Sequence, residues 1–72
     1  MNILITGGNG FLGSNLTRHF VNKGCKIGLI LRKKSFLGRI NDLIPQVSFI
    51  SNTSYLKIND FIGTFNPDVI LH

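Results

Sequence analysis

Four of the seven residues from Gly7 to Gly13 are glycine, and they directly follow the apolar run Ile3-Leu4-Ile5. Glycine loses more backbone entropy on folding than any other residue, so such a cluster requires a specific cause. A short run of branched apolar residues that ends at glycine is typical of a strand buried on both faces. The opening of the chain therefore predicts a strand over residues 2–6 that leads into a glycine loop.

The spacing of the glycines favours a loop that binds phosphate. Backbone N–H groups at the start of a helix bind phosphate without a charged side chain, provided that no side chain blocks the backbone. Gly7 would turn the chain off the strand, Gly10 would let a pyrophosphate approach, and Gly13 would let the helix lie close to the sheet. Gly8, Gly10 and Gly13 also fit the spacing G-x-G-x-x-G, which is typical of dinucleotide-binding loops. A tight turn without a ligand is the alternative, whereas a mononucleotide P-loop is excluded because no Gly-Lys-Ser or Gly-Lys-Thr follows.

Helices and strands alternate along the rest of the chain. The predicted elements are a helix that stops at Gly24, a strand over 27–31, a helix from near Ser35 to Pro45, a strand over 47–50, a helix over 56–65 and a strand over 69–71. Asn66-Pro67-Asp68 predicts a turn before the last strand, because proline disfavours helix in the residue before it. Strands that alternate with helices over short connections imply a parallel sheet with helices on its faces, so the chain is predicted to be α/β.

Composition limits the classes of protein to which the chain can belong. With 43% hydrophobic and 15% charged residues, its 72 residues suit one small globular domain over 1–72, without an apolar run long enough to span a membrane. Because Cys25 is a single cysteine and no secretory signal opens the chain, a reducing cytoplasm is expected. The histidines, the cysteine and the three acidic residues show no metal-ligand spacing. The net charge of +5 includes only one short cluster, Arg32-Lys33-Lys34, so no nucleic-acid partner is expected.

Both ends of the chain resemble one family of enzymes. The extended short-chain dehydrogenases/reductases carry the signature Thr-Gly-x-x-Gly-Phe-x-Gly, which is matched here by Thr6, Gly7, Gly10, Phe11 and Gly13. The last seven residues, NPDVILH, resemble the family's fourth strand, which usually reads Pro-Asp-x-Val-x-His. The resemblance implies the N-terminal part of a Rossmann-type doubly wound parallel sheet with the element order β-α-β-α-β-α-β.

The resemblance also implies which residues meet the cofactor. A dinucleotide would lie across the ends of the strands with its pyrophosphate at Gly10 to Leu12. Asn52 stands where many members carry an aspartate, and it is expected to hydrogen-bond the adenine edge. His72 lines up with a family histidine next to the cofactor, although a frayed terminus is the alternative. The family moves its proton with a Ser or Thr and a Tyr-x-x-x-Lys pair, but Tyr55, expected in a loop, has Asn59 four positions on, so no catalytic residue is expected here.

The residues after the second predicted strand indicate which dinucleotide is bound. An NAD site usually presents a carboxylate there, which hydrogen-bonds the ribose and repels the extra phosphate of NADP. This chain instead reads Leu31-Arg32-Lys33-Lys34-Ser35. We interpret the segment as a pocket for the 2′-phosphate of NADP, with Arg32 as the main contact and Lys33 or Ser35 in support. The alternatives are NAD as the cofactor and a set of solvated loop charges.

The resemblance implies a function for the protein to which such a cofactor site belongs. Family members are NAD(P)-dependent nucleotide-sugar epimerases, dehydratases and 4-keto-sugar reductases that act by hydride transfer, and NADPH usually serves reduction, which favours a 4-keto-sugar reductase. A non-catalytic NADP-binding sensor or regulatory module is the alternative. Because a sheet that ends after its fourth strand has an unpaired edge, the chain is also expected to associate with itself.

Overall fold

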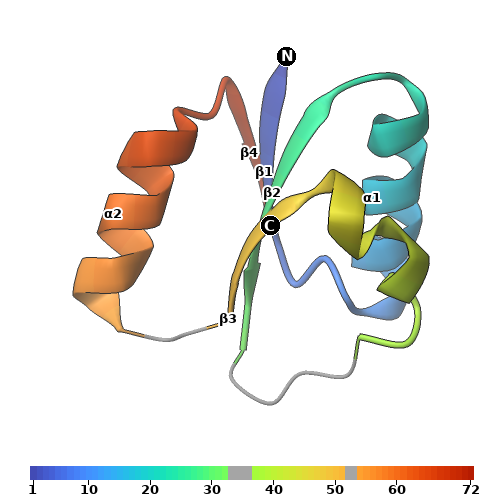
Figure 1. Cartoon of the computed structure of the whole chain (residues 1–72), viewed down its shortest axis with the longest axis horizontal. Helices are drawn as coiled ribbons and strands as arrows, with labels where there is room; N and C mark the ends of the chain where they lie inside the picture. Colours follow the sequence, from blue (N-terminus) through green and yellow to red (C-terminus); the bar gives the residue numbers. More distant parts are fainter. Residues whose placement is uncertain (33–36, 52–53) are drawn as a thin grey trace.

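The computed structural model describes residues 1–32, 37–51 and 54–72. Its elements are β1 (Asn2–Thr6), α1 (Phe11–Asn22), β2 (Lys26–Leu31), the 3₁₀ helix η1 (Asn41–Gln46), β3 (Ser48–Ser51), α2 (Tyr55–Phe65) and β4 (Val69–Leu71). The four strands form a parallel sheet in the order β3-β2-β1-β4. Figure 1 shows α1 and η1 on one face of this sheet and α2 on the other. The predicted Rossmann-type α/β fold is thereby confirmed.

Most of the core lies between the sheet and the layer formed by α1 and η1. The register pairs Ile3 with Ile27 and Ile5 with Leu29, so these alternate residues of β1 and β2 share one face. All four side chains are at most 2% exposed. Because a fully buried side chain of this kind contributes about 1.5–3 kcal/mol, the two central strands supply much of the stabilisation of the fold.

The opposite face of the sheet is covered by α2 through Phe65, which is 5% exposed. A Cβ on Gly28 of β2 would lie 3.0 Å from the Phe65 ring, so the missing side chain lets the ring lie against the strand. Phe61 stacks on Phe65 with ring centroids 6.1 Å apart, and the Lys26 ammonium lies 5.6 Å from the Phe65 centroid. The cover is partial, because Ile70 of β4 remains 48% exposed.

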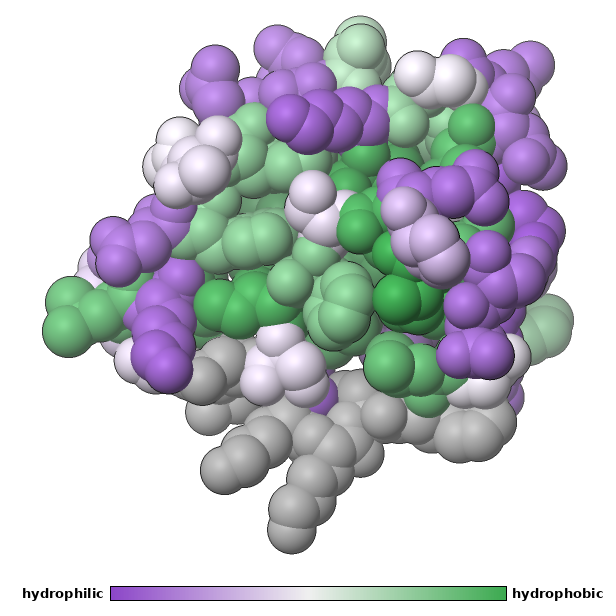
Figure 2. All heavy atoms as spheres, in the orientation of Figure 1, coloured by the Kyte–Doolittle hydropathy of each residue, from purple (hydrophilic) through white to green (hydrophobic). Residues whose placement is uncertain are grey.

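Apolar surface remains between the two helical layers. Figure 2 shows apolar atoms across the middle of one face, over the region where Figure 1 places β3 and η1, and polar atoms along its sides. Phe49 of β3 is 39% exposed. The edge of the sheet at β3 is therefore less polar than the outer surfaces of the helices.

The segment before Pro45 differs from the prediction. Instead of an α-helix from near Ser35 to Pro45, a turn precedes the 3₁₀ helix η1, and Pro45 lies inside that helix; Ser35 itself is outside the described residues. A 3₁₀ helix has three residues per turn, so Ile40 and Leu43 point to the same side, and they are 0% and 3% exposed. A spacing of three residues fits both kinds of helix, which is why the periodicity predicted the wrong one.

The end of α1 was predicted correctly. Gly24 has a φ of 82°, and its N–H donates to the Val21 carbonyl at 3.0 Å, while Cys25 N donates to the Phe20 carbonyl at 3.0 Å. This pair of bonds satisfies the last carbonyls of the helix and requires a left-handed residue, which favours glycine. In contrast, Tyr55 was expected in a loop and is instead the first residue of α2.

Candidate functional site

The glycine loop joins the carboxyl end of β1 to the start of α1. Gly7 has a φ of 70°, which a side chain would strain, and Gly10 N donates to the Gly7 carbonyl at 3.1 Å, which closes the turn. Gly10 is the cap residue of α1, and its carbonyl accepts from Ser14 N at 2.8 Å. Phe11 and Leu12 follow in the first turn, where amide groups have no acceptor within the helix. The positive end of the helix dipole therefore lies beside the loop.

Gly8 and Gly13 are required by the shape of the loop itself. A Cβ on Gly13 would lie 2.9 Å from the Gly7 carbonyl carbon, and a Cβ on Gly8 would lie 2.5 Å from Leu29 Cδ2. Gly13 was predicted to let the helix lie close to the sheet. The structure shows that Gly13 brings the helix close to the loop, whereas Gly8 brings the loop close to β2.

Thr17 ties the loop to the helix, and the sequence reasoning missed it. Its side chain is 0% exposed, and its hydroxyl is shared between the Gly13 carbonyl at 2.8 Å and the Gly8 carbonyl at 3.4 Å. Ser14, at 6% exposure, donates to the Phe11 carbonyl at 2.9 Å. A hydroxyl on the inner face of an amphipathic helix, four residues after a loop glycine, is the signal that could have revealed Thr17.

Gly10 differs from these glycines because the fold does not require it. A Cβ there would have an ordinary contact of 3.5 Å with the Gly7 carbonyl oxygen, and its φ of −75° is open to any residue. The missing side chain instead leaves the backbone accessible at the start of α1. A bound pyrophosphate needs this close approach, so the loop fits a dinucleotide.

A cavity of about 270 Å³ lies between the first turn of α1 and the carboxyl ends of β1 and β4. The strand order reverses at β1, with β2 on one side and β4 on the other, and doubly wound sheets bind their ligands at such a point. The residues that line the cavity are Ile5, Thr6, Gly7, Gly10, Leu12, Gly13, Leu16, Leu71 and His72. Five of them, Gly7, Gly10, Leu12, Gly13 and His72, were singled out from the sequence.

His72 reaches the cavity from β4. Its Nδ1 lies 3.4 Å from Thr6 Oγ1, and Thr6 Oγ1 also donates to the Leu71 carbonyl at 3.5 Å. These contacts bring the carboxyl ends of β1 and β4 together beside the glycine loop. Leu12 is 70% exposed at the rim, and Phe11, the first residue of α1, is 74% exposed next to it.

Arg32 follows β2 at the same edge of the sheet. It is exposed, and its carbonyl accepts a hydrogen bond from Ser51 Oγ at 3.3 Å, which joins the carboxyl ends of β2 and β3. The structure therefore places the predicted main contact of the 2′-phosphate at the edge that carries the glycine loop. Lys33, Ser35 and Asn52, the other residues predicted around the adenosine, lie outside the described residues.

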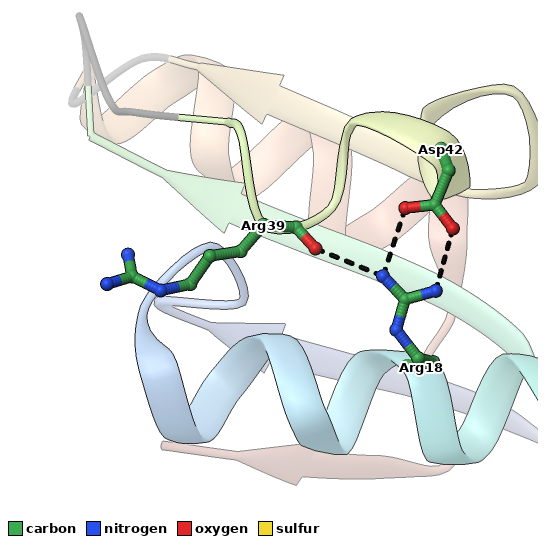
Figure 3. A network of polar contacts seen from close by, with 3 residues as sticks. All are labelled: Arg18, Arg39 and Asp42. Atoms are coloured by element: carbon green, nitrogen blue, oxygen red, sulfur yellow. Dashed lines mark hydrogen bonds and ion pairs between the residues drawn. The ribbon is translucent and has the colours of Figure 1, made fainter.

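An ion pair connects α1 with η1 (Figure 3). Arg18 Nη1 and Nη2 donate to the two carboxylate oxygens of Asp42 at 2.7 and 3.0 Å, and Nη2 also donates to the Arg39 carbonyl at 3.1 Å. The hydrogen bond from Arg18 lowers the pKa of Asp42, and Asp42 in turn raises the pKa of Arg18. The two side chains are 43% and 63% exposed, so water screens the pair.

Neither a metal-ligand group nor a membrane-spanning helix is present over residues 1–32, 37–51 and 54–72. Within these ranges no three His, Cys, Asp or Glu side chains lie together in a group that could hold a metal ion. Across the same ranges no helix is long and apolar enough to cross a membrane.

Sequence comparison relates the chain to enzymes that act on sugars. The family model described as the NAD dependent epimerase/dehydratase family matches residues 3–72. The chain is 35% identical over 80 residues to a probable dTDP-glucose 4,6-dehydratase of Sinorhizobium fredii, a match that covers 100% of this chain and 22% of that protein. It is 38% identical over 50 residues to the UDP-2-acetamido-2,6-beta-L-arabino-hexul-4-ose reductase of Pseudomonas aeruginosa. That match covers 69% of this chain and 13% of that protein.

Solved structures share the fold. The dTDP-glucose 4,6-dehydratase of Bacillus anthracis, crystallised with NAD, matches with a TM-score of 0.80 at 27% identity over 97% of this chain and 25% of that one. The UDP-glucose 4-epimerase of Thermotoga maritima matches with a TM-score of 0.83 at 22% identity over 100% of this chain and 24% of that one, which shows the shared fold. This chain spans 22% and 13% of the length of the two curated relatives, and it corresponds to the N-terminal, nucleotide-binding part of the fold. The chain belongs to the NAD dependent epimerase/dehydratase family, the extended short-chain dehydrogenases/reductases.

Proposed function

We propose that this chain binds NADP(H) and forms the cofactor-binding part of an enzyme that transfers hydride to or from a nucleotide sugar. The observation that carries the proposal is the cavity at the carboxyl ends of β1 and β4, where the backbone at Gly10 is accessible. The names of the Sinorhizobium and Pseudomonas relatives, a dTDP-glucose dehydratase and a reductase of a UDP-linked sugar, support the substrate class. The NAD in the Bacillus anthracis structure supports a dinucleotide cofactor.

In this proposal the backbone holds the pyrophosphate. Gly7 and Gly13 shape the loop, and the pyrophosphate lies against the accessible backbone of Gly10 to Leu12. The amide groups of Phe11 and Leu12 donate to its oxygens, because the Gly10 amide donates to the Gly7 carbonyl. An anion at a helix N-terminus gains about 0.3–1 kcal/mol from the helix dipole at an exposed site, in addition to its hydrogen bonds. Phe11 covers the entrance of the site from the first turn of α1.

In this proposal, side chains bind the parts of the cofactor on either side of the pyrophosphate. Arg32, supported by Lys33 or Ser35, contacts the 2′-phosphate, because a guanidinium matches the geometry of a phosphate and no carboxylate follows β2 to repel it. Asn52 hydrogen-bonds the adenine edge, and His72 lies next to the cofactor at the end of β4.

The bound dinucleotide supplies the hydride chemistry, and the residues of this chain bind and orient it. Tyr55 is 76% exposed at the start of α2 and has Asn59 four positions on, so no proton-transfer residue is assigned within the chain. Within the family we favour reduction of a 4-keto sugar, because the basic segment after β2 favours NADPH and the Pseudomonas relative is named as a reductase. Oxidation of NADPH by the intact protein with a 4-keto nucleotide sugar would distinguish this from a sensor without catalysis.

The substitution Gly10→Ala tests whether the loop binds the dinucleotide. An added methyl group has only an ordinary contact with the fold, but it occupies the place where a pyrophosphate approaches the backbone. Hydrogen bonds to charged groups contribute about 1.5–3 kcal/mol, so we expect the affinity for NADPH to fall about tenfold to a hundredfold. Fluorescence titration of the intact protein with NADPH measures the change.

Gly63→Ala is the matched control. Gly63 lies on α2, and a Cβ there meets nothing within 4 Å, so the same change should leave NADPH binding intact. The proposal would be wrong if Gly10→Ala bound NADPH as tightly as Gly63→Ala, while neither variant unfolded below the temperature of the unsubstituted protein.

A further inference from the structure

The strand β4 is anchored at the amino edge of the sheet by Asp68, the residue that precedes it. The Asp68 N–H donates to the Asn2 carbonyl at 2.7 Å, and the Asn2 N–H donates to Asp68 Oδ2 at 2.7 Å. Both main-chain groups of Asn2 are therefore bound by one residue. Because the Asp68 side chain is short, the two bonds form together only when Asp68 stands directly opposite Asn2.

The Asn2 side chain fixes the end of α2 at the same point. Its Nδ2 donates to the carbonyls of Phe65 and Asn66, at 3.0 and 3.3 Å. Asn66 ends α2 in the left-handed conformation with a φ of 53°, and its N–H donates to the Ile62 carbonyl at 2.9 Å. The turn that leads from α2 into β4 is thus held by both the main chain and the side chain of one residue of β1.

One register connects this anchor with the cofactor cavity. Asn2 lies 66 positions before Asp68, and Thr6 lies 66 positions before His72. The strand pairs between them have the same spacing, and they are Ile3 with Val69, Leu4 with Ile70 and Ile5 with Leu71. The contact of β1 with β4 therefore has Asn2 and Asp68 at its amino end and Thr6 and His72 at its carboxyl end, without an interruption.

The anchor matters because β4 has little else to hold its register. The strand has three residues, none of them fully buried, and β1 is its neighbour in the described sheet. Its middle residue, Ile70, is 48% exposed. Buried side chains normally specify the register of a strand, and a slip of one residue moves every side chain to the other face of the sheet. Such a slip in β4 would take His72 away from Thr6 and the cavity.

We infer that Asp68 and Asn2 are positioning residues that hold His72 at the cofactor cavity from the opposite edge of the sheet. The inference rests on the proposed function, in which His72 lies next to the dinucleotide, and it adds two residues that do not touch the cofactor. The contact of His72 Nδ1 with Thr6 Oγ1, at 3.4 Å, is the point at which a change of register can be measured.

Asp68→Ala tests the anchor in the intact protein, with the ring signals of His72 followed by NMR and identified by their loss in His72→Gln. We expect Asp68→Ala to shift these signals, as Thr6→Val does, because the ring loses its contact with Thr6. The signals of His19 on α1 should stay in place in both variants. Asp68→Asn should keep the His72 signals of the unsubstituted protein, because an amide oxygen still accepts from the Asn2 N–H.

The affinity for NADPH, measured by fluorescence titration, shows whether the anchor serves the cofactor. In Asp68→Ala the affinity should fall about threefold to tenfold, the loss expected for one hydrogen bond. The same substitution should cause no further fall in His72→Gln, since both changes then remove the same contact. Asp60→Ala removes a carboxylate from the exposed surface of α2 and should change neither the His72 signals nor the affinity.

Asn2→Ala provides a second test, which replaces the first if Asp68→Ala does not fold. The substitution keeps the main-chain bond from Asp68 but releases the end of α2. It should shift the His72 signals in the same direction as Asp68→Ala, and by a smaller amount.

The outcomes separate this inference from the proposed function. If the protein binds NADPH but the variants of Asp68 and Asn2 lower the unfolding temperature without moving the His72 signals, or move them without a loss of affinity, the inference is wrong while the proposed function stands. If the unsubstituted protein binds neither NADPH nor NADH, both are overturned. A shift of the His72 signals together with a loss of affinity that disappears in His72→Gln supports the inference.

Discussion

A single hydroxyl group, that of Thr17, ties the glycine loop to α1. Thr17→Val keeps the shape of the side chain but removes the donor that the Gly13 and Gly8 carbonyls share at 2.8 and 3.4 Å. We expect the free energy of unfolding to fall by about 1 kcal/mol, the typical net contribution of one hydrogen bond. The affinity for NADPH should fall as well, because the loop loses its tie to α1. Urea unfolding and NADPH titration measure the two effects.

Thr64→Val on the exposed side of α2 is the control for this change. It removes the same hydroxyl group from a helix that does not line the cavity, so neither stability nor binding should change appreciably. Equal unfolding curves for Thr17→Val and Thr64→Val would contradict the role assigned to Thr17.

Between elements, the ion pair that joins α1 to η1 requires the charge of Asp42. The hydrogen bond from Arg18 lowers the pKa of this carboxyl group. A group whose pKa is lowered by folding adds stability above its ordinary value, about 4 for a carboxyl, and loses that contribution as the pH falls through the lowered value. We therefore expect the unfolding temperature of the unsubstituted protein to exceed that of Asp42→Asn at pH 7, and the difference to be smaller at about pH 2.

Circular dichroism during heating, at both pH values, checks this expectation. Because the pair is exposed, the difference should be small and should shrink in about 1 M salt. Arg18→Gln should remove the same contribution at pH 7. A difference between the unsubstituted protein and Asp42→Asn that was equal at both pH values would show that charge is not its cause.

Over the whole molecule, apolar surface stays exposed although the chain is compact. The radius of gyration is 11.0 Å, close to the value of about 11 Å expected for a folded chain of this length. Phe49 on β3 and Ile70 on β4 are nevertheless 39% and 48% exposed, and both strands lie at edges of the described sheet. Edge strands with apolar side chains tend to pair with other chains. We expect the 72-residue chain by itself to self-associate, with an apparent mass that rises with concentration in sedimentation equilibrium.

Ile70→Lys should weaken that association. Burial of an isoleucine contributes about 1.5–3 kcal/mol, so the concentration needed for association should rise about tenfold or more. Asn59→Lys adds the same charge to the exposed surface of α2 and should have little effect. A monomer at every concentration, with unfolding that does not depend on concentration, would contradict the expectation.

The sequence by itself determined the elements and the site residues that depend on local chemistry. β1 and β2 are short apolar runs, and burial of their side chains stabilises a central strand in any packing of this kind. Gly7 and Gly24, with φ values of 70° and 82°, occupy backbone conformations that glycine adopts without strain, so both could be located without knowing the fold. The spacing of Gly7, Gly10 and Gly13 likewise predicted residues that line the cavity.

Only the tertiary structure decided the features that depend on residues distant in the chain. Ile40 and Leu43 suit an α-helix or a 3₁₀ helix equally, and the structure has the 3₁₀ form with both side chains in the core. Arg18 and Asp42 lie 24 positions apart, so no local pattern could pair them. Thr17 resembles any helix threonine until the loop folds back to within 3.4 Å of its hydroxyl. Contacts of this kind form only once the strands have assembled, because the sheet sets the distance between the segments it joins.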